Sequence, residues 1–200
     1  MNRIIRPGLV IGISAVGGGG KTVVTHRLTE VLGDAVALHF DDYDDTNVHP
    51  NYPGWFADGA DYDRFQTPVF SSHLEALKTG RSVRYPVGDV TLKPAKYVVA
   101  DAPLGRAHSE SGRFIDFMVF IDTPLDVAMA RRILRNIKRE TDWSLEETVE
   151  YVKGEMAGYL SQARPIYEDF QDQIRRGCDL IVDGNLSIDK IVEIIRARIH

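Results

Sequence analysis

The fold of this 200-residue chain can be predicted from one stretch, Ala15-Val16-Gly17-Gly18-Gly19-Gly20-Lys21-Thr22. A short apolar run, Leu9–Ile13, precedes this stretch, and Lys21–Leu32 has the pattern of a helix that ends at Gly33. Phosphate oxygens need several N–H donors that converge from one side, and a glycine-rich turn before a helix N-terminus supplies them. The stretch therefore predicts a phosphate-binding loop (P-loop).

The residue types of this loop indicate what each position does. Lys21 offers a positive charge to the outer phosphates of a nucleotide, and the Thr22 hydroxyl can ligate Mg²⁺. The motif G-x-x-x-x-G-K-T begins here with Ala15, which is tolerable if the φ angle of that residue is negative. A flexible glycine linker would not explain why Lys-Thr opens a helix. We expect ATP and Mg²⁺ as cofactors, held by Ala15, Gly17, Gly18, Gly19, Gly20, Lys21 and Thr22, although the motif alone does not separate kinases, GTPases and ATPases.

Apolar runs typical of strands alternate with helical patterns along the chain. The expected strands are Leu9–Ile13, Ala35–Phe40, Tyr97–Ala100, Phe114–Ile121 and Leu180–Val182. The expected helices are Lys21–Leu32, Pro68–Lys78, Pro124 to about Arg139, a helix that begins with a capping box at Ser144 and is broken by Pro165, and Ile188–Ile199. This alternation predicts an α/β protein with a three-layer P-loop fold, in which a parallel sheet of about five strands carries helices on both faces. We expect a single domain, residues 1–200, with a small helical lid over about residues 135–165.

Composition narrows the function classes. The hydrophobic fraction is 44%, the charged fraction is 26%, and a net charge of −5 is spread without a basic block, which argues against a nucleic-acid partner. No apolar run approaches the roughly 18 residues of a membrane span. The single cysteine, Cys178, excludes an internal disulfide and a thiolate metal cluster. We expect a cytoplasmic protein with a small-molecule partner and no membrane partner, and homo-oligomerisation stays open.

Carboxylates follow two of the expected strands. Asp41 and Asp42 come after the second strand, and Asp101 ends the third. In an open parallel sheet the ligand crevice lies at the carboxyl ends of the strands, so these acids are expected near the phosphates. Asp41 can accept the proton of an acceptor hydroxyl and, with Thr22 and Asp101, lie beside the metal. The alternative is a solvated acidic turn.

Arginines form a second group of candidates. Arg106 follows the third strand closely enough to reach an anionic group of the substrate, or it is an ordinary surface arginine. Arg132, Arg135 and Arg139 share one face of a predicted helix. Phosphoryl transfer needs positive charge around the moving group once the site closes, so we favour a lid over the alternative of a solvated helix face.

With these residues identified, the chain resembles the uridine kinase and phosphoribulokinase-like family of P-loop kinases. The similarity runs from the P-loop through Phe40-Asp41-Asp42-Tyr43, Asp58–Asp63, Tyr85-Pro86-Val87-Gly88-Asp89 and Val98–Asp101 to Ile121–Pro124, Arg131–Arg135, Arg164-Pro165 and Cys178–Val182. The resemblance implies Asp41 as the catalytic base, aided by Lys21 and Arg135, with Arg135 on the nucleotide phosphates. It further implies substrate contacts from Asp42, Asp58, Asp89 and Arg132.

The chain departs from that family where the nucleobase is recognised. Gly88 and Lys93 occupy the places of a tyrosine and a histidine that contact the pyrimidine in family members. We therefore expect a uridine-kinase-like enzyme, an ATP-dependent phosphotransferase with an alcohol group as acceptor, whose acceptor pocket is altered. The alternatives are a uridine or cytidine kinase proper, and a nucleotide-binding ATPase or regulator without a small acceptor.

Overall fold

The central sheet has five strands, all parallel, in the order β2–β5–β1–β6–β7. In the computed structural model, which describes residues 8–199, these strands are β1 Leu9–Ser14, β2 Ala35–Leu38, β5 Tyr97–Asp101, β6 Phe117–Asp122 and β7 Leu180–Asp183. All five predicted strands are confirmed, and residues 1–7 and 200 of the predicted domain lie outside the described part. The register pairs Ile13 of β1 with Asp101 of β5, so Asp101 lies beside the start of the P-loop.

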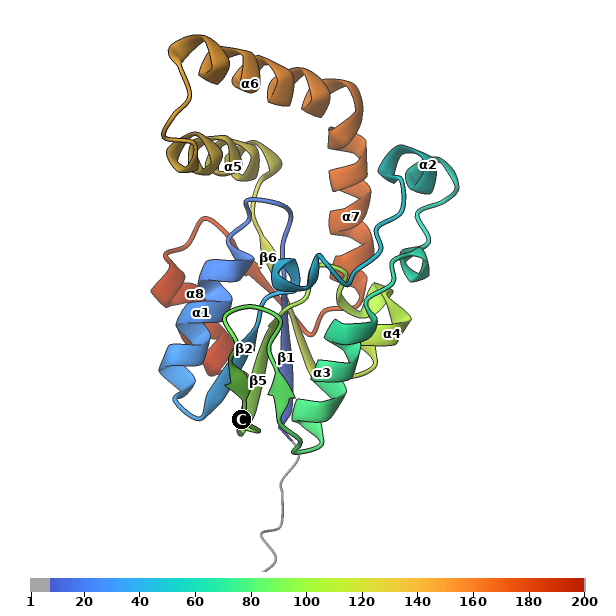
Figure 1. Cartoon of the computed structure of the whole chain (residues 1–200), viewed down its shortest axis with the longest axis vertical. Helices are drawn as coiled ribbons and strands as arrows, with labels where there is room; N and C mark the ends of the chain where they lie inside the picture. The colour runs from blue at the N-terminus through green and yellow to red at the C-terminus, as the bar shows by residue number, and fades with distance from the viewer. Residues whose placement is uncertain (1–7, 200) are drawn as a thin grey trace, which may run out of the picture.

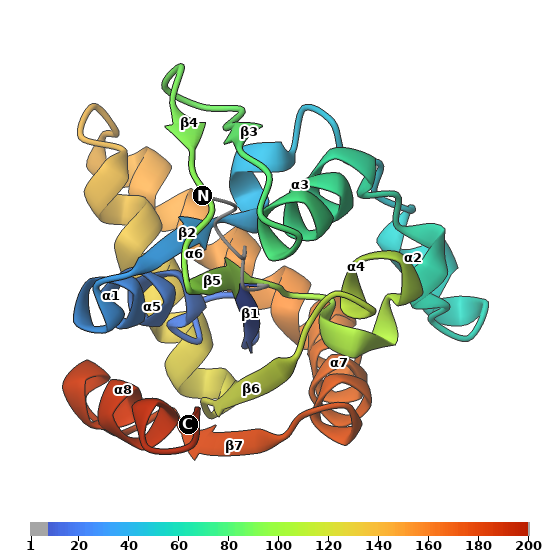
Figure 2. The ribbon, with the colours of Figure 1, turned by 90° about the horizontal axis from the view of Figure 1, so that it is seen from below.

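Helices cover both faces of the sheet, as Figures 1 and 2 show. One face carries α1 (Lys21–Leu32) and α8 (Ile188–Arg196), and the other carries α3 (Pro68–Lys78) and α4 (Ser109–Gly112). Successive strand residues point to opposite faces, so each strand feeds two apolar layers. Val10, Val98 and Met118 are buried with α3, whereas Ile11, Val99 and Val119 are buried with α1 and α8. The three-layer prediction is confirmed.

Three helices form an arch between β6 and β7. It consists of α5 (Leu125–Arg139), α6 (Leu145–Gly158), the π-helical turn η4 (Tyr159–Ala163) and α7 (Arg164–Arg176). Figure 1 shows the arch above the carboxyl end of the sheet. The predicted capping box is confirmed, because the Ser144 hydroxyl accepts from the Glu147 N–H and the Glu147 carboxylate accepts from the Ser144 N–H.

The predicted helix break at Pro165 is wrong. Helical backbone runs on from α6 through the π-helical turn, and Pro165 lies in the first turn of α7. A first-turn proline needs no intrahelical N–H bond, so it is tolerated there. In Figure 1 the change of direction between α6 and α7 falls at this junction.

The polar segment between β2 and α3 contains short helices that the sequence did not predict. They are η1 (Phe40–Tyr43), α2 (Tyr52–Ala57) and η2 (Tyr62–Arg64). Further along the chain lie an antiparallel hairpin of β3 (Val83–Arg84) and β4 (Thr91–Leu92), and the single turn η3 (Gly105–Ala107). None of the described helices is both long and apolar enough to cross a membrane.

Candidate active site

The P-loop connects β1 to α1 with a backbone that only glycine suits at its centre. Gly18 and Gly20 have φ angles of 88° and 99°, in the left-handed region. A Cβ atom added to Gly18 would lie 2.2 Å from the carbonyl oxygen of Ala128, the first turn of α5. Ala15 is not among the residues of positive φ, which meets the condition for its replacing the first glycine of the motif.

A buried threonine that the sequence did not single out holds this loop. The hydroxyl of Thr123, just after β6, donates to the carbonyl oxygen of Gly19 at 2.9 Å. The Gly19 N–H donates in turn to the Val16 carbonyl oxygen at 2.8 Å. From α7, the side-chain amide of Gln171 donates to the Thr123 carbonyl oxygen at 3.2 Å. The loop is thus fixed from both β6 and the arch.

Lys21, Thr22 and Asp101 form one cluster at the start of α1. The Thr22 hydroxyl donates to one Asp101 oxygen at 2.9 Å, and the Lys21 ammonium lies 4.0 Å from the other. Burial raises the pKa of Asp101, Lys21 and Thr22 oppose that rise, and the negative charge of Asp41 adds to it. One Asp101 oxygen is buried without a hydrogen-bond partner among residues 8–199. A carboxylate oxygen and a hydroxyl are ligands that suit Mg²⁺, so this cluster fits the expected cation.

The pair Asp41 and Asp42 is divided by the short helix η1. Asp41 is exposed and lines a large cavity that also reaches Lys21. Asp42 instead accepts a 2.5 Å hydrogen bond from the Tyr85 hydroxyl, which itself accepts from the His39 N–H. Asp42 therefore anchors η1 to the β3–β4 hairpin. Asp42 lines neither of the two cavities described below, and its contact with the substrate stays a prediction.

Two cavities meet at Lys21, which lines both. The smaller, of about 340 Å³, surrounds the N-terminal turn of α1. Its other walls are Arg131 and Arg135 of α5 and residues at the start of α8, including Leu186 and Ile188. Glycine backbone, a helix N-terminus and guanidinium groups together suit a polyphosphate.

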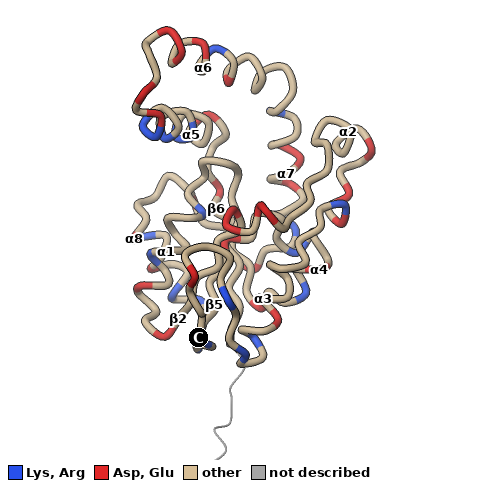
Figure 3. The backbone as a smooth tube through the Cα atoms, viewed as in Figure 1, with Lys and Arg blue, Asp and Glu red and all other residues tan. Residues whose placement is uncertain are grey.

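The larger cavity, of about 610 Å³, lies between η1, α2 and α7. Asp41 and Lys21 mark the end of this cavity that meets the P-loop. Figure 3 shows the acidic stretch around η1 at the carboxyl end of the sheet, below the arch. Aromatic side chains make up much of the remaining wall: Phe40, His49, Tyr52, Trp55, Tyr62, Phe65, Tyr167 and Phe170. These residues were not predicted as site residues; for those between β2 and α3 the signal was an unusually long polar segment that contains several tyrosines, and for Tyr167 and Phe170 on α7 there was none.

Arg132 and Arg135, predicted to lie on one helix face, face different neighbours. Arg135 lines the smaller cavity. Arg132 is half-buried and donates to Glu155 of α6 at 2.9 Å and to the Tyr167 hydroxyl of α7 at 2.5 Å. An added Cβ on Gly17 would lie 3.8 Å from an Arg132 guanidinium nitrogen, so Arg132 is adjacent to the P-loop. Both arginines therefore lie near the P-loop, Arg135 at the smaller cavity and Arg132 beside Gly17.

Two predicted substrate contacts lie outside both cavities. Asp58, at the end of α2, forms an exposed ion pair with Arg64 at 2.8 Å. Asp89, in the β3–β4 hairpin, forms an even more exposed pair with Arg84 at 2.6 Å. Each carboxylate pairs with a neighbouring arginine, and its role as a substrate contact stays a prediction.

Arg106 has a structural role. Its guanidinium donates to the carbonyl oxygens of Ile115, Asp116 and Gly177 and pairs with Asp179 at 2.8 Å. These bonds join η3 to the strand starts of β6 and β7. Arg106 lines neither cavity, and its contact with the substrate stays a prediction.

Sequence comparison finds relatives that are kinases, as the P-loop and its neighbouring residues suggest. Proteins called uridine kinase match the chain from Chlamydia pneumoniae (25% identity, 96% of this chain and 88% of the relative), Halobacterium salinarum (28%, 88% and 80%) and Leuconostoc citreum (29%, 87% and 86%). The chain is thus similar to these uridine kinases over most of its length. The resemblance found in the motifs is thereby confirmed over most of the chain, although no protein-family model matches it.

A solved structure shares the fold of this chain. A candidate fructose transport system kinase from Silicibacter sp. TM1040 superposes with a TM-score of 0.55 at 13% identity, over 90% of this chain and 92% of that protein. At such low identity the likeness concerns the fold alone. The three-layer α/β P-loop fold of the chain is therefore shared with a kinase-type structure.

Proposed function

We propose that this chain is an ATP-dependent kinase that transfers the γ-phosphoryl group to a hydroxyl of a small molecule. The observation that carries the proposal is the meeting of two cavities at Lys21. One of them has the glycine backbone and helix N-terminus that suit phosphates, and the other has a carboxylate, Asp41, beside the same lysine. A regulator that only hydrolyses nucleotide has no use for a second cavity of this size.

The proposed chemistry assigns one task to each group at the junction. Asp41 accepts the proton of the acceptor hydroxyl as the hydroxyl oxygen bonds to the γ-phosphorus and the bond from that phosphorus to ADP breaks. Lys21 stabilises the charge on the phosphoryl oxygens. Thr22 and Asp101 would hold Mg²⁺, which when bound neutralises phosphate charge.

The arch is proposed to act as the lid of a single domain. Arg135 already lines the smaller cavity, where it can contact nucleotide phosphates. Arg132 is held by Glu155 and Tyr167, and releasing Glu155 would free its guanidinium for the phosphoryl group. The helices of the arch, 125–176, extend beyond the lid of about 135–165 that the sequence predicted.

The segment with Gly88 and Lys93, which suggested an altered acceptor pocket, does not identify the acceptor. Gly88 and Lys93 are exposed in and after the β3–β4 hairpin and do not line the large cavity. They give no reason to exclude uridine. The pocket is instead defined by the aromatic wall, so uridine and cytidine belong in the same test as other acceptors.

The test is ADP release with ATP and Mg²⁺, measured for a panel of small hydroxyl acceptors against a no-acceptor background. At least one acceptor should raise the rate well above background, and mass spectrometry should find that acceptor phosphorylated. ATP hydrolysis that no acceptor stimulates would overturn the kinase and favour the ATPase or regulator. A cytoplasmic location stays a prediction from the sequence.

A further inference from the structure

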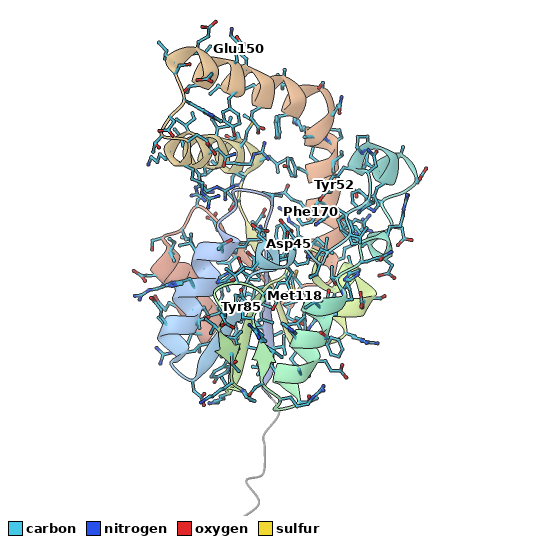
Figure 4. All side chains as sticks on the ribbon, viewed as in Figure 1. Asp45, Tyr52, Tyr85, Met118, Glu150 and Phe170 are labelled. Atoms are coloured by element: carbon cyan, nitrogen blue, oxygen red, sulfur yellow. The ribbon has the colours of Figure 1, made fainter. Side chains whose placement is uncertain are left out.

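The aromatic wall of the large cavity has no role in the chemistry described above. Tyr52 of α2 and Phe170 of α7 both line the cavity, and Figure 4 labels both of them near α7. Trp55 meets Tyr62 edge-to-face with ring centres 5.2 Å apart, and meets Phe65 in the same way at 5.5 Å. Tyr52 and Phe170 extend this cluster, at 6.0 Å from Phe65 and 6.4 Å from Tyr62. The rings hold one another in place and present a preformed π surface to the cavity.

One polar group in this wall has no partner. Tyr62 is 6% exposed, lines the cavity, and its hydroxyl makes no hydrogen bond to any residue within 8–199. The nearby carboxylate of Asp169, on α7, also has an oxygen that is buried without a partner in that range. Burial, with the charge of Asp169 second, raises the pKa of Tyr62, so the hydroxyl stays protonated. Buried polar groups are rarely left unpaired, which points to a ligand group at this position.

The charges around the cavity favour one kind of ligand. Asp41 and Asp44 line it, and Asp169 is close enough to Tyr62 for its charge to raise the pKa of that hydroxyl. Among the described lining residues the cationic types are Lys21, which is directed to the phosphates, and His49, whose ring lies 3.5 Å from Asp44. An anionic acceptor would therefore meet mostly like charge. Aromatic faces backed by carboxylates attract a cation, both through the ring quadrupoles and through direct Coulomb attraction.

We infer that the acceptor bound in the large cavity carries a flat ring with a positive charge, held against the aromatic wall with Asp44 and Asp169 as its counter-charges. The Tyr62 hydroxyl donates to a polar substituent of that ring. This inference rests on the proposed kinase function and specifies its acceptor. Lys93, whose charge would suit an acidic acceptor, lies outside the cavity.

The test uses two acceptors that differ in charge but have the same sugar. Nicotinamide riboside has a cationic pyridinium ring, and its dihydro form has a neutral ring with the same ribose hydroxyls. With ATP and Mg²⁺, we expect kcat/KM for the cation to exceed that for the dihydro form and for uridine by about tenfold or more. Equal or better turnover of the neutral compounds would overturn the inference and leave the kinase standing.

Single substitutions test which residues cause the preference for the cationic acceptor. Asp44→Asn and Asp169→Asn should each reduce the preference for the cation severalfold, through KM more than kcat, and Tyr62→Phe should raise KM for nicotinamide riboside. Each test variant has a matched control. Asp45→Asn, at the exposed neighbour of Asp44, is the control for Asp44→Asn, and Asp172→Asn, at an exposed position one turn further along α7, is the control for Asp169→Asn. Tyr97→Phe, at the far end of β5, is the control for Tyr62→Phe. If controls and test variants lower the preference equally, the assigned counter-charges are wrong. If neither the cationic nor any neutral acceptor in the panel, uridine and cytidine included, raises ADP release above background, the proposed function fails first.

Discussion

The two cavities on either side of Lys21 are built in different ways. The smaller one is made mainly from one contiguous stretch, residues 18–24 of the P-loop and the first turn of α1. The larger one meets the loop at residues 15–17, but most of its wall consists of side chains from η1, α2, η2 and α7, and more than 100 residues separate η1 from α7 in the chain. Phosphate is recognised by N–H groups that every sequence has, whereas an acceptor is recognised by the particular side chains around it. The comparison predicts that the smaller cavity is sensitive to changes in its backbone, whereas the larger cavity is sensitive to changes in its side chains.

The largest effect is expected at the junction itself. Lys21→Ala removes the cation that both cavities share, so turnover should fall by about 10³–10⁵, the range known for a cation that stabilises a transferring phosphoryl group. Calorimetry should also show the loss of most ATP affinity, without a loss of folding. Lys190→Ala, at an exposed lysine paired with Glu193, is the control. Unchanged ATP affinity in Lys21→Ala would contradict the assignment of the smaller cavity.

A substitution at Asp41 tests the larger cavity without changing the smaller one. Asp41→Asn should cut kcat by about 10²–10⁴, the usual contribution of a positioned general base, while ATP affinity stays the same. Asp42→Asn should keep most activity, because an amide oxygen can still accept from the Tyr85 hydroxyl. If Asp42→Asn is inactive and Asp41→Asn is active, the base is the other member of the pair.

The backbone-built side is expected to be sensitive to a single methyl group. Gly18→Ala should destabilise the protein by about 3 kcal/mol or more, since it adds a clash with Ala128 to the cost of a left-handed conformation. Gly20→Ala meets no atom within 4 Å and should cost only about 1–2 kcal/mol. Urea unfolding of both variants measures the difference. Equal losses would show that conformation, and not the contact with α5, limits the loop.

The smallest effect concerns Asp101 and depends on pH. Its pKa is raised in the folded protein, so its contribution to stability is present below the unfolded pKa, about 4, and is lost as pH rises through the folded value. Asparagine is neutral at every pH, so Asp101→Asn avoids the loss of stability that ionisation of Asp101 causes. The Tm of the variant should exceed that of the parent protein by about 2–4 °C at neutral pH, and this difference in Tm should disappear in acid. Thermal unfolding across pH checks this, with exposed Asp34→Asn as control. A variant that is less stable at neutral pH would contradict it.

The same contrast explains how much could be predicted from the sequence. The five strands, α1, α3 and the Lys21–Thr22–Asp101 cluster follow from local patterns and from the rule that strand ends share an edge. The helices α2 and η2 lack any apolar period, and their burial depends on the packing of Trp55 and Phe65 against rings from elsewhere. Sequence spacing also does not reveal that Arg64 pairs with Asp58 and Arg84 with Asp89.

The arch has a thermodynamic consequence. Its first helix, α5, forms a wall of the smaller cavity and its last, α7, forms a wall of the larger. Arg132, Glu155 and Tyr167 join all three of its helices, so a displacement of one is transmitted to the others. If the arch moves as one body, nucleotide and acceptor each shift the same equilibrium. Linkage then requires that ATP increase acceptor affinity by the same factor by which the acceptor increases ATP affinity, and Glu155→Gln should bring both factors closer to one.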